Sequence, residues 1–269
     1  MAHDMVVMDT ITCSAAISAC EKGGEWAKAL EVLNRMLKSR IKMNTITYNA
    51  AVSACAKGGA WMNALDLLGA MWRGSVEMNA ITYSAAIGAC EQGREWEKAL
   101  DLLHSMAHGR VEMDTIAFSA AISACERGGE WRKALELLDA MMHGRVRTDA
   151  ITYTAAIRAC GRCGAWLKAL NLLNAMALGS VEMNVITYNS AISACERSGE
   201  WMKAVDLLNV MVQVSVEMDT LTCSAAISAC EKGGAWIKAL NLLDVMAQRR
   251  IEMNTITCNA AISACGKRG

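Results

Sequence analysis

Apolar residues recur along the chain at helical spacing, in segments that glycines separate. In residues 45–57, Ala, Val and Cys follow a helical period, and Gly58 and Gly59 then favour a helix stop. Residues 61–71 carry Trp, Ala, Leu and Met at i, i+3, i+4 and i+7, the stripe of an amphipathic helix, and Gly74 follows. β-branched residues are sparse and no strand-like alternation persists, so the pattern predicts an all-α fold of helical hairpins.

The hairpin pattern repeats every 35 residues: ITYNAAVSAC at Ile46 recurs as ITYSAAIGAC at Ile81 and as ITYTAAIRAC at Ile151. A period of this size predicts a stack of equivalent units, an α-solenoid forming one repeat domain over residues 1–269. The predicted complete repeats, numbered 1 to 7, are 10–44, 45–79, 80–114, 115–149, 150–184, 185–219 and 220–254. Residues 1–9 are the tail of a preceding repeat and 255–269 a partial eighth, so we expect a piece of a longer array or one without recognisable end caps.

The composition limits the kinds of compartment and binding partner that we expect for this chain. Although 54% of the residues are hydrophobic, none of the apolar runs approaches the roughly 20 residues of a membrane span. The 27 basic and 27 acidic residues cancel, which disfavours a nonspecific basic nucleic-acid binder but still allows one basic face. No signal or transit peptide is visible.

Cysteine usage favours a reducing intracellular compartment over a disulfide framework, because eight of the 12 cysteines share one register position and are expected to be small core residues. Three further cysteines, Cys13, Cys223 and Cys258, replace the Tyr or Phe of other repeats. The eight register cysteines are Cys20, Cys55, Cys90, Cys125, Cys160, Cys195, Cys230 and Cys265.

A tryptophan recurs just after the glycine turn, at the start of each second helix. Because it never varies, we interpret it as a packing residue between the two helices of a repeat and the next hairpin, not as a ligand-stacking residue. These residues are Trp26, Trp61, Trp96, Trp131, Trp166, Trp201 and Trp236.

Four positions of the first helix, the second, fifth, ninth and thirteenth of the repeat, share one face. The ninth is mostly Ser. The second is aliphatic in every repeat: Ile11, Ile46, Ile81, Ile116, Ile151, Ile186, Leu221 and Ile256. The fifth is a small polar residue of changing identity: Ser14, Asn49, Ser84, Ser119, Thr154, Asn189, Ser224 and Asn259. The thirteenth is basic at Lys22, Lys57, Arg127, Arg162, Arg197, Lys232 and Lys267, with Gln92 as the exception.

Such a stripe would line a solenoid groove with an apolar, a variable polar and a cationic lane. Single-stranded nucleic acid suits these lanes, because its bases stack on apolar faces, its base edges accept specific hydrogen bonds and its phosphates attract cations. Alternatively, the polar residues are simply solvated and the basic residues complement the helix dipole.

The last residue of each repeat favours the first interpretation, since it is always Asn or Asp. Helix capping explains this restriction, but not its combination with a changing fifth residue, whereas two variable polar positions could read one base edge. The terminal residues are Asn44, Asn79, Asp114, Asp149, Asn184, Asp219 and Asn254, with Asp9 before repeat 1.

The 35-residue period, the T-Y-N-type opening, the glycine turn after Cys, the A-L-x-L-L second helix and the V-E-M-N ending together resemble the pentatricopeptide repeat family. The resemblance covers Thr10 to Gly269 and implies a right-handed superhelical α-solenoid that binds single-stranded RNA, one base per repeat. The family's Pro before the terminal Asn or Asp is replaced by Met or Thr, and the chain contains no proline, so we expect a less rigid linker.

The resemblance also implies roles for the variable face. The fifth and last residues would read bases through Ser14 with Asn44, Asn49 with Asn79, Ser84 with Asp114, Ser119 with Asp149, Thr154 with Asn184, Asn189 with Asp219, and Ser224 with Asn254. The implied target is 5′-A(C/U)GGAUA-3′, while Asn259 lacks a terminal partner and assigns nothing. The second-position residues would clamp the bases, and Lys22, Lys57, Arg127, Arg162, Arg197 and Lys232 would approach phosphates. The family further implies a monomer active in RNA processing, stability or translation in a mitochondrion or plastid, with its convex face open to protein partners.

The sequence offers no chemistry that would make the chain an enzyme, and it predicts no cofactor or metal. Cys160 and Cys163 form the single C-x-x-C, but one is a register cysteine and the other stands in a turn. His104 and His108 have no third ligand nearby. The zinc deaminase signature, a phosphate loop and a nucleophile elbow are missing from the sequence.

Two other functions remain open at this stage. A protein-binding solenoid of the tetratricopeptide kind also stacks helical hairpins, although its usual period is 34 residues. A structural array without a ligand is the third possibility.

Overall fold

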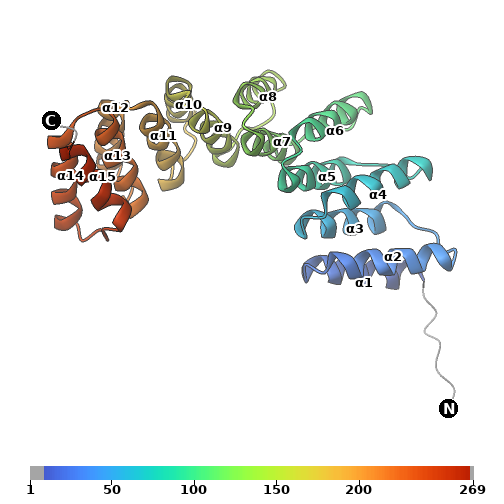
Figure 1. Cartoon of the computed structure of the whole chain (residues 1–269). Coiled ribbons are helices and arrows are strands. Elements are labelled where there is room, and N and C mark those ends of the chain that lie inside the picture. Colours follow the sequence, from blue (N-terminus) through green and yellow to red (C-terminus); the bar gives the residue numbers. More distant parts are fainter. Residues whose placement is uncertain (1–8, 267–269) are drawn as a thin grey trace, which may run out of the picture. The chain divides into compact units, whose positions relative to one another are not determined.

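The computed structural model describes residues 9–266, and these form α-helices joined by short turns (Figure 1). The first helices of the hairpins are α1 (Thr10–Lys22), α3 (Thr45–Lys57), α5 (Ala80–Gly93), α7 (Thr115–Gly128), α9 (Ala150–Arg162), α11 (Val185–Ser198), α13 (Thr220–Lys232) and α15 (Thr255–Gly266). The second helices are α2 (Trp26–Lys38), α4 (Trp61–Arg73), α6 (Trp96–His108), α8 (Trp131–His143), α10 (Trp166–Leu178), α12 (Trp201–Gln213) and α14 (Trp236–Gln248). The all-α prediction is confirmed.

The predicted helix ends are also confirmed, and local chemistry explains them. The Asn44 side chain caps α3 by accepting the Thr47 backbone N–H at 3.0 Å, which satisfies an amide that has no partner within the helix. At the other end, Gly58 is the C-cap and Gly59 follows at φ +71°, a left-handed conformation that suits glycine. The predicted tail at residues 1–8 and the basic residue Lys267 lie outside the described residues.

The described residues group into two compact units. Unit 1 comprises residues 9–128 and 143–146, and unit 2 comprises residues 129–142 and 147–266. In unit 1 the first helices α1, α3, α5 and α7 pack side by side in chain order, and each second helix packs on its own first helix and on the next one (Figure 1). In unit 2 the first helices α9, α11, α13 and α15 stack in the same way. Each unit is therefore an α-solenoid of two helix layers.

Small residues make the core between successive first helices. Ala51, Cys55, Ala86 and Cys90 are completely buried, which lets the helices approach closely. Burial raises the pKa of the Cys55 and Cys90 thiols to about 11, so these thiols stay protonated at neutral pH and have little thiolate reactivity. The interpretation of the register cysteines as core residues is confirmed for most of them, while Cys20 and Cys265 at the outer repeats are half-buried.

Four of the recurrent tryptophans, Trp26, Trp61, Trp96 and Trp201, pack on the glycine turn of the next repeat. The Trp26 ring occupies the place where a Cβ on Gly58 would lie, with only 2.1 Å between them, and Trp61 stands in the same relation to Gly93 at 2.4 Å. A side chain at this glycine would displace the ring. The packing role predicted for these tryptophans is therefore confirmed.

Three of the methionines that stand where the family has proline pack against the core, whereas Met253 is 44% exposed. Met43 and Met78 are partly buried against the core cluster of unit 1, and Met218 packs against a cluster in unit 2. An apolar contact therefore holds the linker where a proline would fix the backbone. Within residues 9–266, none of the helices is long and apolar enough to cross a membrane.

Candidate nucleic-acid interface

The second position of every repeat exposes a large aliphatic side chain. Exposure ranges from 56% at Ile186 to 79% at Ile11, and all eight residues stand in the first turn of a first helix. Single exposed apolar residues are ordinary, but a row of them in fixed register marks a surface that a ligand can cover. The structure thus leaves the predicted base-clamping residues accessible.

The last residue of each repeat caps the following helix with one side-chain oxygen. Oδ1 of Asn79 accepts the Thr82 backbone N–H at 3.1 Å, and Oδ1 of Asp219 accepts that of Thr222 at 2.8 Å. Because a backbone N–H can only donate, the capping atom must be an oxygen in Asn as in Asp. The second atom of the side chain is then a nitrogen donor in Asn79 and an oxygen acceptor in Asp219.

Three predicted base-reading pairs are in direct contact, although their members are 30 residues apart. Nδ2 of Asn49 donates to Oδ1 of Asn79 at 3.2 Å, and Nδ2 of Asn189 donates to Oδ1 of Asp219 at 3.3 Å. The third such contact runs from Ser84 Oγ to Asp114 Oδ1 at 3.4 Å. In both units the structure therefore places the fifth residue against the last residue of its own repeat.

Other pairs are joined through a threonine of the following repeat. Oγ of Ser14 lies 2.7 Å from Oγ1 of Thr47, whose hydroxyl is 2.9 Å from Oδ1 of Asn44. The same link connects Thr154 with Asn184 through Thr187, and Ser224 with Asn254 through Thr257. Ser119 and Asp149 belong to different units, so their pairing stays a prediction from the sequence.

The linking threonine, at the third position of the repeat, is a site residue that the sequence reasoning missed. It is completely buried in repeats 2, 3, 5, 6 and 7 and in the partial eighth repeat. Its signal was its own recurrence, because only repeat 4 departs from Thr, with Ala117. In repeat 4, Asp114 accepts the Ala117 backbone N–H at 2.8 Å, and the third position supplies no hydroxyl.

Hydrogen bonds keep the Asp219 carboxylate ionised. Partial burial raises the pKa of Asp219. Hydrogen bonds from the Thr222 hydroxyl, the Thr222 backbone N–H and the Asn189 amide lower the pKa by more, so that it lies below the ordinary value of 3.8. Asp219 is therefore an acceptor at neutral pH.

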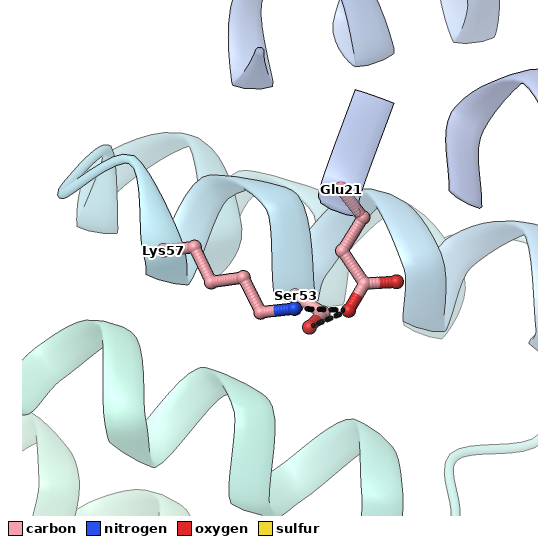
Figure 2. A network of polar contacts seen from close by, with 3 residues as sticks. All are labelled: Glu21, Ser53 and Lys57. Atoms are coloured by element: carbon pink, nitrogen blue, oxygen red, sulfur yellow. Dashed lines mark hydrogen bonds and ion pairs between the residues drawn. The ribbon is translucent and has the colours of Figure 1, made fainter. Parts of the chain in front are cut away.

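Three of the thirteenth-position cations are partly neutralised by glutamates of the preceding repeat. Lys57 Nζ lies 2.8 Å from Oε1 of Glu21, which also accepts the Ser53 hydroxyl at 2.8 Å (Figure 2). Equivalent pairs join Arg127 to Glu91 at 3.2 Å and Lys232 to Glu196 at 3.0 Å. The acidic neighbours thus reduce the positive charge of this lane.

In unit 2 the same face forms an open groove of about 520 Å³. Its lining includes the aliphatic residues Ile186 and Leu221, the predicted base-reading residues Asn189 and Asp219, and the cation Arg197. The three lanes expected from the sequence therefore meet in one groove, which can receive a ligand with flat apolar parts, polar edges and negative charge.

The cysteine pair and the histidine pair noted in the sequence do not form a metal or redox site among the described residues. Burial raises the pKa of the Cys160 thiol to about 11, whereas Cys163 is exposed and lies 3.3 Å from the Gly129 carbonyl. The His108 ring bonds to the His104 carbonyl at 2.8 Å. Residues 9–266 contain no group of three or more side chains placed to hold a metal ion.

Fold and surface together define a tandem helical-repeat protein with an accessible row of aliphatic and polar residues on its first helices. Sequence comparison specifies the class: the PPR repeat family matches residues 8–57, 148–197 and 183–232. The pentatricopeptide repeat domain matches 101–163, and the PPR repeat matches 46–76, 81–110 and 221–251. The chain belongs to the pentatricopeptide repeat family. A search of curated proteins found no match.

Solved structures share the fold. The crystal structure of the pentatricopeptide repeat protein PPR10 from maize is 21% identical, with a TM-score of 0.57, over 98% of this chain and 42% of that protein. PPR10 in complex with an 18-nt psaJ RNA element gives 17% identity and a TM-score of 0.58, over 98% and 43%. The PPR domain of Arabidopsis thaliana protein-only RNase P 1, solved in complex with tRNA, is 16% identical, with a TM-score of 0.59, over 66% of this chain and 94% of that domain. The chain spans about two fifths of the maize protein.

Proposed function

We propose that this chain binds single-stranded RNA in a sequence-specific manner, one base per repeat, and acts in RNA processing, stability or translation. The observation that carries the proposal is that one side-chain oxygen of the terminal Asn or Asp caps the helix, while the second atom takes no part in the cap and could meet a base. The PPR10 complex with RNA supports the choice of ligand.

Base choice follows from the second atom of the terminal residue. Asn79 presents Nδ2, a donor suited to the acceptor nitrogens of A and C, whereas Asp219 presents Oδ2, an acceptor suited to the N–H groups of G and U. The family association of Ser or Thr at the fifth position with purines, and of Asn with pyrimidines, completes the assignment. The proposed target, read in the family's parallel orientation, is 5′-A(C/U)GGAUA-3′.

The remaining lanes supply affinity. Each base would lie between the exposed aliphatic residues of successive repeats, at or below the low end of the roughly 1 to 3 kcal/mol that aromatic stacking contributes per base. Six complete repeats carry a cation, which limits the slope of log affinity against log salt to about 4 in magnitude. The glutamate pairs lower this limit.

The proposed function is RNA binding without catalysis. We propose that the protein acts in a mitochondrion or plastid. Equilibrium binding to 5′-ACGGAUA-3′ at a stated salt concentration tests it, with a permuted RNA and the equivalent DNA as controls. We expect preference for the target RNA. Equal affinity for the permuted RNA would refute the base assignments, and absence of RNA binding would favour a protein-binding scaffold.

A further inference from the structure

The hydroxyl proton of Ser14, at the fifth position of repeat 1, has a definite place. Oγ of Ser14 lies 2.7 Å from Oγ1 of Thr47, and the Thr47 hydroxyl is 2.9 Å from Oδ1 of Asn44. Oδ1 of Asn44 also accepts the Thr47 backbone N–H, so it is an oxygen, and only the Thr47 hydroxyl can supply the proton between them. Because Thr47 has a single hydroxyl proton, Ser14 must donate to Thr47.

A serine whose proton is engaged in this way offers only lone pairs to a base. Ser14 is therefore an acceptor on the variable face. The same chain of bonds, from the fifth residue to a threonine and from the threonine to the terminal Asn, occurs in two repeats of unit 2: Thr154 to Thr187 to Asn184, and Ser224 to Thr257 to Asn254. The fifth residue is an acceptor in these repeats as well.

Repeat 3 lacks this threonine. The third position of the following repeat holds Ala117, which is completely buried and has no hydroxyl. Ser84 donates directly to Oδ1 of Asp114, but the distance of 3.4 Å exceeds the usual range of about 2.5 to 3.0 Å for an O–H···O bond. The contact is therefore weak, and Ser84 can turn its proton toward a base at little cost.

We infer that the third residue of the following repeat determines whether the fifth-position hydroxyl accepts from the base or donates to it. This inference rests on the proposed function. Where a threonine engages the proton, the hydroxyl accepts from the 6-amino group of adenine, and the terminal Asn donates to N1. Beside Ala117 the Ser84 hydroxyl donates to O6 of guanine, and Asp114 accepts from N1–H. The third residue acts through the fifth and is a positioning residue.

The base assignments, which rest on the fifth and last residues alone, follow the same division. The three repeats in which a threonine engages a hydroxyl are assigned to A, and repeat 3 is assigned to G. In repeats 2 and 6 the fifth residue is Asn, and the threonine donates to its amide oxygen instead. Ser119 and Asp149 of repeat 4 belong to different units, so this repeat does not bear on the relation.

Two matched pairs of variants test the inference. Thr47→Val removes the hydroxyl beside Ser14 at nearly constant volume, and Thr47→Ser retains it. Ala117→Thr installs a hydroxyl beside Ser84, and Ala117→Val adds a side chain of the same shape without one. Each chain is titrated with 5′-ACGGAUA-3′ and with RNAs that carry G at the first base or A at the third.

The two hydroxyl changes should act in a defined direction. Thr47→Val should reduce the preference for A over G at the first base by about fivefold, the equivalent of one hydrogen bond, because the released Ser14 proton can meet O6 of guanine. Ala117→Thr should reduce the preference for G over A at the third base by a similar factor, because the Ser84 proton becomes engaged. A purely structural third residue would not weaken base choice when it gains a hydroxyl. Thr47→Ser and Ala117→Val should keep the preferences of the parent chain.

A neutron crystal structure of the free chain gives a measurement that does not depend on RNA. We expect the deuteron of the Ser14 hydroxyl to lie between Ser14 and Thr47, and that of Thr47 to point at Asn44. A Thr47 deuteron directed at Ser14 would overturn the inference, whatever the chain binds.

The binding outcomes separate this inference from the proposed function. If the parent chain prefers its target but Thr47→Val matches Thr47→Ser and Ala117→Thr matches Ala117→Val, the role of the third residue is refuted and the base reading stands. A parent chain without preference at either base would refute the base reading and this role with it. Thr187→Val and Thr187→Ser repeat the first pair in unit 2 at the fifth base, so a folding defect at Thr47 does not decide the result.

Discussion

The hydroxyl of Thr82 donates to the side-chain oxygen of Asn49 at 2.6 Å, across 33 residues of sequence. The same hydroxyl accepts the Asn79 backbone N–H at 3.1 Å, and the Thr82 backbone N–H donates to Asn79 Oδ1. The capping bond identifies the side-chain atom of Asn79 that faces Thr82 as an oxygen. The Asn49 atom in contact with this oxygen must be the donor Nδ2. The oxygen of Asn49 then accepts the Thr82 hydroxyl. A buried threonine therefore sets which side-chain atoms of Asn49 and Asn79 face each other.

Replacing Thr82 by Val keeps the volume but removes this hydroxyl. We expect the free energy of unfolding to fall by about 1 kcal/mol, because the oxygen of Asn49 and the Asn79 N–H lose a partner. Discrimination at the second RNA base should also weaken, since Asn49 can then turn its amide. Urea unfolding and binding to RNAs that vary at this base measure the two effects.

Thr82→Ser is the matched control, because it retains the hydroxyl and should retain the base preference. The idea that Thr82 orients Asn49 would be abandoned if Thr82→Val and Thr82→Ser showed the same preference at the second base.

Asp219→Asn separates capping from base reading. Asn and Asp are equally good N-caps, so the stability of α13 should change little. The second atom of the side chain changes from an oxygen acceptor to a nitrogen donor, so preference at the sixth base should move from U toward C. Affinities for RNAs that differ only at this base provide the measurement.

The control here is Asp219→Ala, which should lose about 1 kcal/mol of stability with the cap and lose discrimination at the sixth base as well. An Asp219→Asn variant that still prefers U would contradict the assignment of the second atom to base reading.

The internal repetition explains what could be predicted from sequence. The hairpin bounds and the tryptophan packing were predictable because each position is seen several times, and the pairing of Asn49 with Asn79 followed from two positions that vary. Thr82 was missed because its position is Thr in every repeat but one and therefore resembles a core position. The ion pair of Glu21 with Lys57 was not predicted, since it depends on how two successive first helices pack.

Tyr188 is completely buried, and its hydroxyl has no hydrogen-bond partner among the residues that the structure describes. A buried hydroxyl without a partner costs about 1 to 3 kcal/mol of desolvation, so Tyr188→Phe should raise the free energy of unfolding by about 1 kcal/mol. Repeat 4 already holds Phe118 at this position. Urea unfolding measures the change, and a variant less stable than the parent chain would show that the hydroxyl is satisfied in solution.

The pair of Glu21 with Lys57 should make stability depend on pH (Figure 2). Partial burial raises the pKa of Glu21, but hydrogen bonds from Lys57 and Ser53 lower it more, leaving it below the ordinary value of 4.5. A carboxylate with a lowered pKa stabilises the folded state above that value, and the contribution is lost as the pH falls through the folded-state pKa.

Glu21→Gln should therefore lower stability by up to about 1 kcal/mol at neutral pH, the upper range for an exposed ion pair. The difference from the parent chain should shrink as the pH is lowered past 4.5, because the parent then loses the charge as well. Urea unfolding of both chains across this range gives the comparison, with Glu25→Gln as a control for an exposed glutamate paired within its own turn to Lys28. A stability difference that stays constant with pH would mean that Glu21 acts through packing and not through its charge.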